Sequence, residues 1–165
     1  MRHSLLLLLA LVFISTGCET RSAKAVRYND AILNQQAEIS LAFNAMDSAL
    51  NTFDGREMEY AQKLLQAEVM KGQKLLDTIG TFRGDSSLLV ASRSLFDFYE
   101  TVAEDDYAEL MHILSIPDST YNRDHQARAY ELDSVIRVEF KVAHDAFVLK
   151  QQKFWDQYHI VSAEE

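Results

Sequence analysis

The chain has very few of the residues that crosslink or interrupt a fold. Its 165 residues include one cysteine, one proline and five glycines. A single cysteine excludes an intramolecular disulfide, and the lack of a C-x-x-C-H sequence excludes covalent haem attachment. A G-x-S-x-G nucleophile turn and a glycine-rich phosphate loop are also missing. We therefore expect no enzymatic activity and no cofactor.

Positive charge is scarce as well. The chain has 16 basic and 25 acidic side chains, a formal net charge of −9. Nucleic-acid binding depends on Lys and Arg side chains that neutralise phosphates, so we expect no nucleic-acid partner. The same charge opposes contact with an anionic lipid surface. Any membrane contact is therefore expected to come from an anchor alone.

The first 17 residues have the order of an export signal. A basic Arg2 precedes ten apolar residues at positions 5–14, and small residues follow at 15–17. Ten apolar residues are too few to cross a bilayer as a helix, which needs about 20. We therefore interpret residues 1–17 as a cleaved signal peptide.

The end of this leader, Thr16-Gly17-Cys18, resembles the lipobox of bacterial lipoproteins, although Ser15 stands where an aliphatic residue is usual. The resemblance implies a diacylglyceryl group, and hence palmitate-type acyl chains, on Cys18. Two or more acyl chains hold a protein stably on a membrane where one does not. The alternative is ordinary cleavage near Gly17, which would leave a free thiol in an oxidising compartment.

Glu19 follows the anchor, whereas Asp there is the usual inner-membrane retention signal. We therefore expect a cell-envelope location, the outer membrane rather than the inner. Residues 18–24 are polar and are expected to form a lipidated tether. Removal of the 17 residues before Cys18 from the 165-residue chain leaves 148 residues, a common size for a chain with one domain. We place this domain after the tether, at residues 25–165.

Three breaks divide this domain into four segments. They are Gly55, the pair Gly80 and Gly84, and Pro117. Apolar residues recur every three or four positions in the segments at about 23–51, 56–79, 86–115 and 121–161, which is the helical period. Short connections favour antiparallel neighbours. The fold class predicted is all-α: an elongated antiparallel up-down four-helix bundle.

The first segment also carries a resemblance. Its opening, AVRYNDAI at residues 25–32 followed by Gln35-Gln36, resembles the start of a family of uncharacterised helical surface lipoproteins of bacteria. The resemblance implies the same location and four-helix layout, and it implies no particular activity.

Three polar residues fall on predicted core seams: Asn29, Gln36 and Asp106. Bundles build ligand sites from such inward-facing side chains, so these three are the candidate ligand-binding residues. The competing interpretation is that each fixes helix register, as a buried seam Asn does in coiled coils. That interpretation is favoured by the sequence.

No metal site is expected. Glu109 and His112 form one E-x-x-H, whereas di-iron bundles need two of these and two further Glu residues. The acidic run at residues 104–106 points in several directions on a helix and cannot converge on one ion.

Aromatic residues of the last segment allow two interpretations. They could line a groove for a partner helix, or they could fill the bundle interior, which their spacing favours. Trp155 alone falls beside the seam. These residues are Phe140, Phe147, Phe154, Trp155 and Tyr158.

The sequence thus predicts a membrane-anchored lipoprotein that acts as a non-enzymatic interaction or structural module, with an envelope protein as a possible partner. The alternative is a helical bundle that binds a small ligand or a metal.

Overall fold

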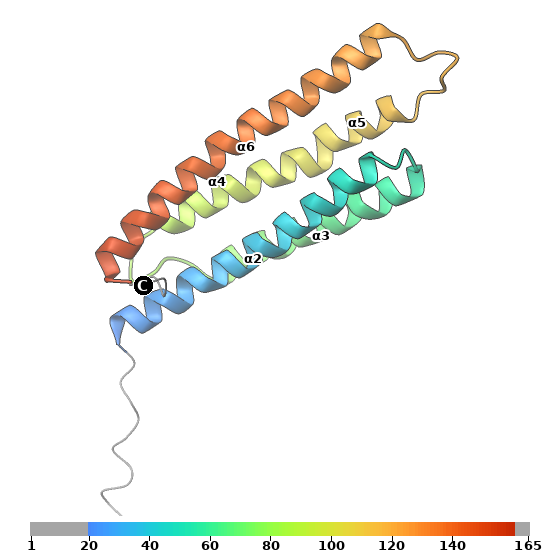
Figure 1. Cartoon of the computed structure of the whole chain (residues 1–165). Coiled ribbons are helices and arrows are strands. Elements are labelled where there is room, and N and C mark those ends of the chain that lie inside the picture. Colours follow the sequence, from blue (N-terminus) through green and yellow to red (C-terminus); the bar gives the residue numbers. More distant parts are fainter. Residues whose placement is uncertain (1–19, 161–165) are drawn as a thin grey trace, which may run out of the picture.

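The computed structural model describes residues 20–160, which fold as four helical segments packed against one another (Figure 1). The predicted all-α class is confirmed. The expected signal peptide and Cys18 lie outside the described residues. The segments are α2 (Arg21–Leu50), α3 (Gly55–Ile79), a third composed of α4 (Ser87–Thr101), the π-helix η2 (Val102–Asp106) and α5 (Tyr107–Leu114), and α6 (Arg123–Tyr158).

Side-chain caps set where the helices begin. The Thr20 side chain accepts a hydrogen bond from the amide of Ala23, so α2 starts at Arg21. Asp54 accepts from the first amides of α3, and Asn122 forms a capping box with His125 at the start of α6. The tether expected over residues 18–24 is therefore too long, because residues 21–24 already belong to α2.

Short connections return the chain along the preceding helix, so the body has two ends (Figure 1). The amino-terminal end contains the start of α2, residues 80–86 and the end of α6. The distal end contains residues 51–54 and 115–122. An α-helix rises 1.5 Å per residue, so the 30 residues of α2 place the two ends about 45 Å apart.

The predicted seams form most of the core. Ile32, Ile39 and Leu65 have no exposed surface. Gly72 marks a close helix crossing, because a Cβ atom there would lie 2.8 Å from ring carbons of Phe96 on α4. Ala in its place would force that ring to move.

The third segment departs from the prediction at one point. A π-helix at residues 102–106 inserts an extra residue, so the core position after Ala103 is Tyr107 rather than Asp106. Tyr107 is 3% exposed, whereas Asp106 is only half-buried. The Ala103 carbonyl accepts a hydrogen bond from Gln62 Nε2 at 3.0 Å, which provides the widened turn with a partner from α3.

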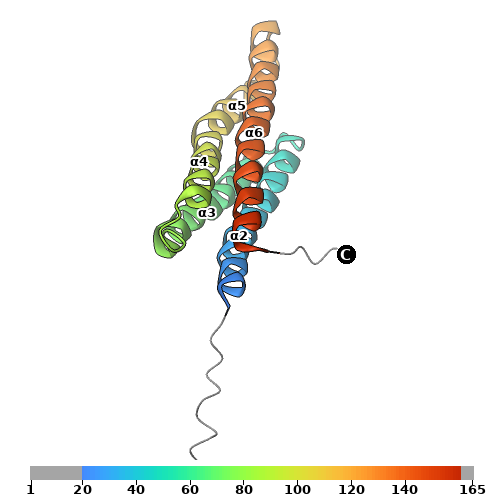
Figure 2. The ribbon, with the colours of Figure 1, turned by 90° about the vertical axis from the view of Figure 1, so that its left-hand side faces the viewer.

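The backbones of α2 and α6 approach each other over a much shorter stretch than those of α2 and α3. Figure 2 views the body from its amino-terminal end, with α4 to the left of α6. Along α6, Phe147 and Phe154 are 2% and 1% exposed, but Phe140 is 40% exposed. The predicted aromatic seam is therefore covered only in its C-terminal part.

None of the helices within residues 20–160 is long and apolar enough to span a bilayer.

Candidate functional site

The three polar residues predicted on the seams do not form one site. Asn29 is 3% exposed at the amino-terminal end, where its Oδ1 accepts hydrogen bonds from Gln151 Nε2 and Trp155 Nε1, both at 3.0 Å. These two hydrogen bonds link α2 to α6, and they provide Oδ1 with two donors. Its geometry is that of a register-setting buried polar group.

Gln36 is half-buried one heptad further along α2, beside Tyr99 of α4. The Tyr99 hydroxyl is buried and has no partner in hydrogen-bond geometry within the described chain. Burial raises the pKa of Tyr99 to about 12, and the Gln36 amide opposes part of that rise. An unpaired buried hydroxyl is uncommon and costs stability.

Asp106 lies on η2 toward the distal end and faces α6. Burial raises its pKa, and the carboxylates of Glu139, Asp105 and Glu109 raise it further. Asn29, Gln36 and Asp106 therefore stand at separate levels of the bundle, and they share no cavity.

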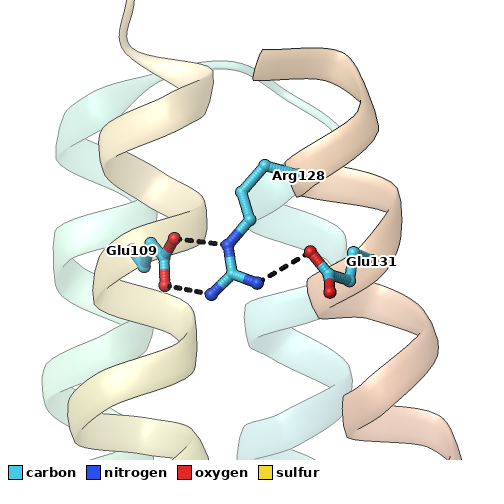
Figure 3. A network of polar contacts seen from close by, with 3 residues as sticks. All are labelled: Glu109, Arg128 and Glu131. Carbon is cyan, nitrogen blue, oxygen red and sulfur yellow. Dashed lines mark hydrogen bonds and ion pairs between the residues drawn. The ribbon is translucent and has the colours of Figure 1, made fainter. Parts of the chain in front are cut away.

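In the E-x-x-H motif, Glu109 is paired with an arginine of α6. Arg128 of α6 donates two hydrogen bonds to Glu109 of α5, at 2.7 and 2.9 Å, and a third to Glu131 (Figure 3). This bidentate pairing lowers the pKa of Glu109, and His112 is exposed. Across residues 20–160 no three His, Cys, Asp or Glu side chains are placed to hold a metal ion.

A groove opens where α2 and α6 separate near the distal end. Its volume is about 200 Å³. Apolar and aromatic side chains form most of its walls, and charged groups lie at its rim. The lining residues are Phe43, Asp47, Leu50, Phe98, Tyr107, Leu110, Asp133, Ile136, Arg137 and Phe140. We call these residues the aromatic groove.

Polar groups of the aromatic groove are paired with each other. The Tyr107 hydroxyl donates to Asp47 Oδ1 at 3.0 Å, and Arg137 Nε donates to Asp133 at 2.9 Å. Burial raises the pKa of Tyr107, and the nearby Asp47 carboxylate raises it further. The tyrosine is therefore a neutral hydrogen-bond donor at physiological pH, with no feature of a nucleophile.

A second hollow adjoins the groove at the distal tip. It has a volume of about 550 Å³, and its lining includes Phe53, Tyr121 and Tyr130. Phe53 is 67% exposed and has φ = 55°, a left-handed conformation that a bulky residue rarely adopts. Exposed aromatic surface is thus concentrated at this end.

A third hollow, about 660 Å³, lies on the outer surface between α2 and α3 and is lined by small residues such as Ala45 and Ala49 with Tyr60 and Leu64. It is larger but wide open. We favour the aromatic groove as the candidate site because it lies between α2 and α6, whose backbones approach each other over only a short stretch, and because it exposes Phe140, which the heptad pattern assigns to the interior.

Charge is divided unevenly between the two halves of the body. If each helical segment is cut at its midpoint, the distal half (residues 36–67 and 101–140) holds 14 acidic and five basic side chains. The other half (residues 21–35, 68–100 and 141–160) holds eight acidic and ten basic side chains. The negative charge of the described chain is thus gathered around the aromatic groove.

At the amino-terminal end a cluster of aromatic side chains fills the space between the helices. The rings of Phe82 and Phe154 contact each other and both contact Tyr28 and Tyr158, with the centroids of Phe154 and Tyr158 4.6 Å apart. The Tyr28 hydroxyl donates to the Gly80 carbonyl at 2.8 Å. Sequence reasoning missed this cluster, because Tyr28 and Phe82 come from segments whose meeting depends on the fold.

No protein family matches the chain, and neither a curated protein nor a solved structure is significantly similar to it.

Proposed function

We propose that the mature protein is a lipid-anchored, non-enzymatic interaction module of the bacterial cell envelope. In this proposal residues 1–17 are removed, acyl chains on Cys18 hold the protein on the outer membrane, and an elongated antiparallel up-down bundle extends from it. The resemblance of residues 25–32 to surface lipoproteins supports the same location. The observation that carries the interaction role is the aromatic groove.

The dimensions of the groove favour a protein partner. Pockets for drug-sized ligands and cofactors measure roughly 300–1,000 Å³, whereas this groove offers about 200 Å³. A space of that size suits one or two apolar side chains of a partner. Exposed aromatic residues such as Phe53 and Phe140 are the residue type that dominates binding energy at protein interfaces.

Electrostatics of the distal half indicate the partner's chemistry. Its 14 acidic and five basic side chains favour a partner with a basic rim around an apolar centre, because complementary charge speeds association and selects among partners.

The anchoring part of the proposal is tested by intact-mass measurement of protein extracted from native membranes. We expect a chain that begins at Cys18 and carries acyl groups, and we expect Cys18→Ala to move the protein to the soluble fraction. An unmodified thiol with the leader still attached would overturn this part.

The interaction part is tested with a photo-crosslinking residue placed at Phe140 in cells. Its matched control is the same residue at Val90, which is 58% exposed on α4 in the other half. We expect one discrete adduct from position 140, none from position 90, and loss of the adduct when Asp47→Lys reverses a rim charge. Equal labelling at both positions, or an adduct that survives the charge reversal, would contradict a specific groove.

The alternative function, a bundle that binds a small ligand or a metal, has one observation in its favour. The Tyr99 hydroxyl is buried without a partner in hydrogen-bond geometry, and the Tyr99 ring contacts the groove residues Phe43 and Phe140 at centroid distances of 5.2 and 6.3 Å. A small apolar molecule with one hydrogen-bond acceptor would satisfy that hydroxyl. Native mass spectrometry of purified protein distinguishes this alternative, because it would show a bound mass of a few hundred daltons or less.

A further inference from the structure

We infer that the amino-terminal end of the bundle is a docking surface for the anionic headgroups of the membrane in which the protein is anchored. The surface contains Arg21, Lys24 and Arg27 on α2 and Arg83 in the connection between α3 and α4. This inference rests on the proposed lipid anchor. It also revises the expectation that acyl chains alone make the membrane contact, which was drawn from net charge.

The length of the chain before α2 brings this end to the membrane. Cys18 precedes the helix cap Thr20 by two residues. A chain spans at most about 3.6 Å per residue, so the two Cα atoms are within about 7 Å of each other. A body held on so short a link lies at the headgroups.

The end of α6 is fixed to this surface as well. Ser22 Oγ donates to the His159 carbonyl at 3.1 Å, and the Arg21 guanidinium lies 4.8 Å from the centre of the Tyr158 ring. The start of α2 and the end of α6 therefore face the membrane together, as their shared position in Figure 1 shows.

The charge of this end complements anionic lipid. Arg21, Lys24 and Arg27 are exposed, and the first acidic residue of α2 is Asp30. Three acidic residues oppose these charges at the same end: Glu19 beside the anchor, Asp85 in the connection that contains Arg83, and Asp156 near the end of α6. The Debye length is about 8 Å at physiological ionic strength, so basic groups within the reach of the link interact with headgroup charge. The acidic distal half begins about 22 Å along α2 and is screened from that charge.

Arg83 adds an independent observation. Phe82 and Asp85 exchange two backbone hydrogen bonds around Arg83 and Gly84, whose φ angles are 53° and 84°. Positive φ at both central residues defines a type I′ turn, in which Asn-Gly is strongly preferred. An exposed arginine in the strained first position is not explained by the turn itself, and sites that depart from local preference are often functional.

The test uses the native acylated protein reconstituted into two kinds of vesicle, one of phosphatidylcholine and one of phosphatidylcholine mixed with phosphatidylglycerol. Trp155 is the only tryptophan of the chain and lies toward the amino-terminal end, bonded to Asn29. Energy transfer from Trp155 to a headgroup-attached dansyl acceptor therefore reports how closely this end approaches the lipid surface. We expect higher transfer in the anionic vesicles, and loss of the difference at high salt.

A triple variant, Lys24→Gln, Arg27→Gln and Arg83→Asn, should lose the difference between the two vesicles. Arg83→Asn places at this position the residue that type I′ turns prefer, so we expect this change not to destabilise the fold. The matched control neutralises Arg56, Lys63 and Arg123 in the distal half, which changes net charge equally, and it should behave as the unaltered protein does.

Two results would overturn the inference: equal transfer in both vesicles for the unaltered protein, or a difference that the triple variant retains. Failure of the anchor is distinguishable from both, because unacylated protein would not be recovered with vesicles of phosphatidylcholine alone.

Discussion

The two ends of the bundle differ in packing, charge and surface. At the amino-terminal end Asn29 bridges α2 and α6, and four aromatic rings close the interior. At the distal end α2 and α6 separate, the aromatic groove opens, and acidic side chains predominate. The comparison shows that close packing and exposed apolar surface lie at opposite ends of one pair of helices.

The comparison is sharpest within α6. Phe140 and Phe147 are one heptad apart and would be equivalent in a uniform bundle, yet they are 40% and 2% exposed. Burial of an aromatic side chain contributes in proportion to the area removed from water. The same heptad position is therefore buried in the interior at Phe147 and lies on the surface at Phe140.

The largest expected effect separates these two residues. Phe147→Ala should lower the free energy of unfolding by roughly 3–5 kcal/mol, the usual cost of a large cavity in a core. Phe140→Ala should lower it by about 1 kcal/mol, since much of the ring is already in water. Urea denaturation followed by circular dichroism measures both. Equal losses would show that the distal end is as tightly packed as the other.

An intermediate effect is expected from the polar pairs at each end. Asn29→Ala leaves the Gln151 amide and the Trp155 indole N–H without an acceptor in the interior, so it should cost roughly 2–4 kcal/mol. Tyr107→Phe at the distal end should cost about 1 kcal/mol or less, because its partner Asp47 is exposed and can be hydrated. Thermal melts of the two variants give the comparison. A costly Tyr107→Phe with a harmless Asn29→Ala would reverse our assignment of the stable end.

The smallest effect concerns Asp106. Its pKa is raised in the folded state by burial and by nearby carboxylates, so its charged form opposes folding above that pKa, and the effect disappears below the ordinary value of 3.8. Asp106→Asn should therefore raise the melting temperature slightly at pH 7 and leave it unchanged in acid. Asp105→Asn, an exposed neighbour on the same π-helix, is the control. A gain that persists below pH 3.8 would mean that the charge of Asp106 is not its cause.

Much of the fold could be read from the sequence because helical periodicity is a local property. Gly55, Gly80 and Pro117 marked the three connections, and apolar residues at the helical period, such as Ile32 and Leu65, are buried. The π-helix could not be foreseen, since its extra residue is accommodated by contacts with α3, including the bond from Gln62 to Ala103. That insertion is the reason Asp106 was placed on the seam in error.

The candidate site was less predictable than the fold. Asn29, Gln36 and Asp106 were chosen for polarity at core positions, but they lie at different levels and line no common cavity. The groove residue Phe43 gave no signal apart from its apolar spacing, and Tyr107 stands one position after the predicted seam residue Asp106. Whether an aromatic residue at such a position is covered depends on how far α2 and α6 separate.

The sequence by itself determined the helical class, the positions of the connections and the total charge, since these follow from composition and from periodicity within each segment. Only the tertiary structure decided where that charge lies. Acidic residues outnumber basic ones in two stretches of the chain, residues 36–67 and 101–140, and the reversal of direction at each connection brings both to the distal end. The same reversals leave Arg21, Lys24, Arg27 and Arg83 together at the opposite end, because neighbouring helices place residues far apart in sequence at one level.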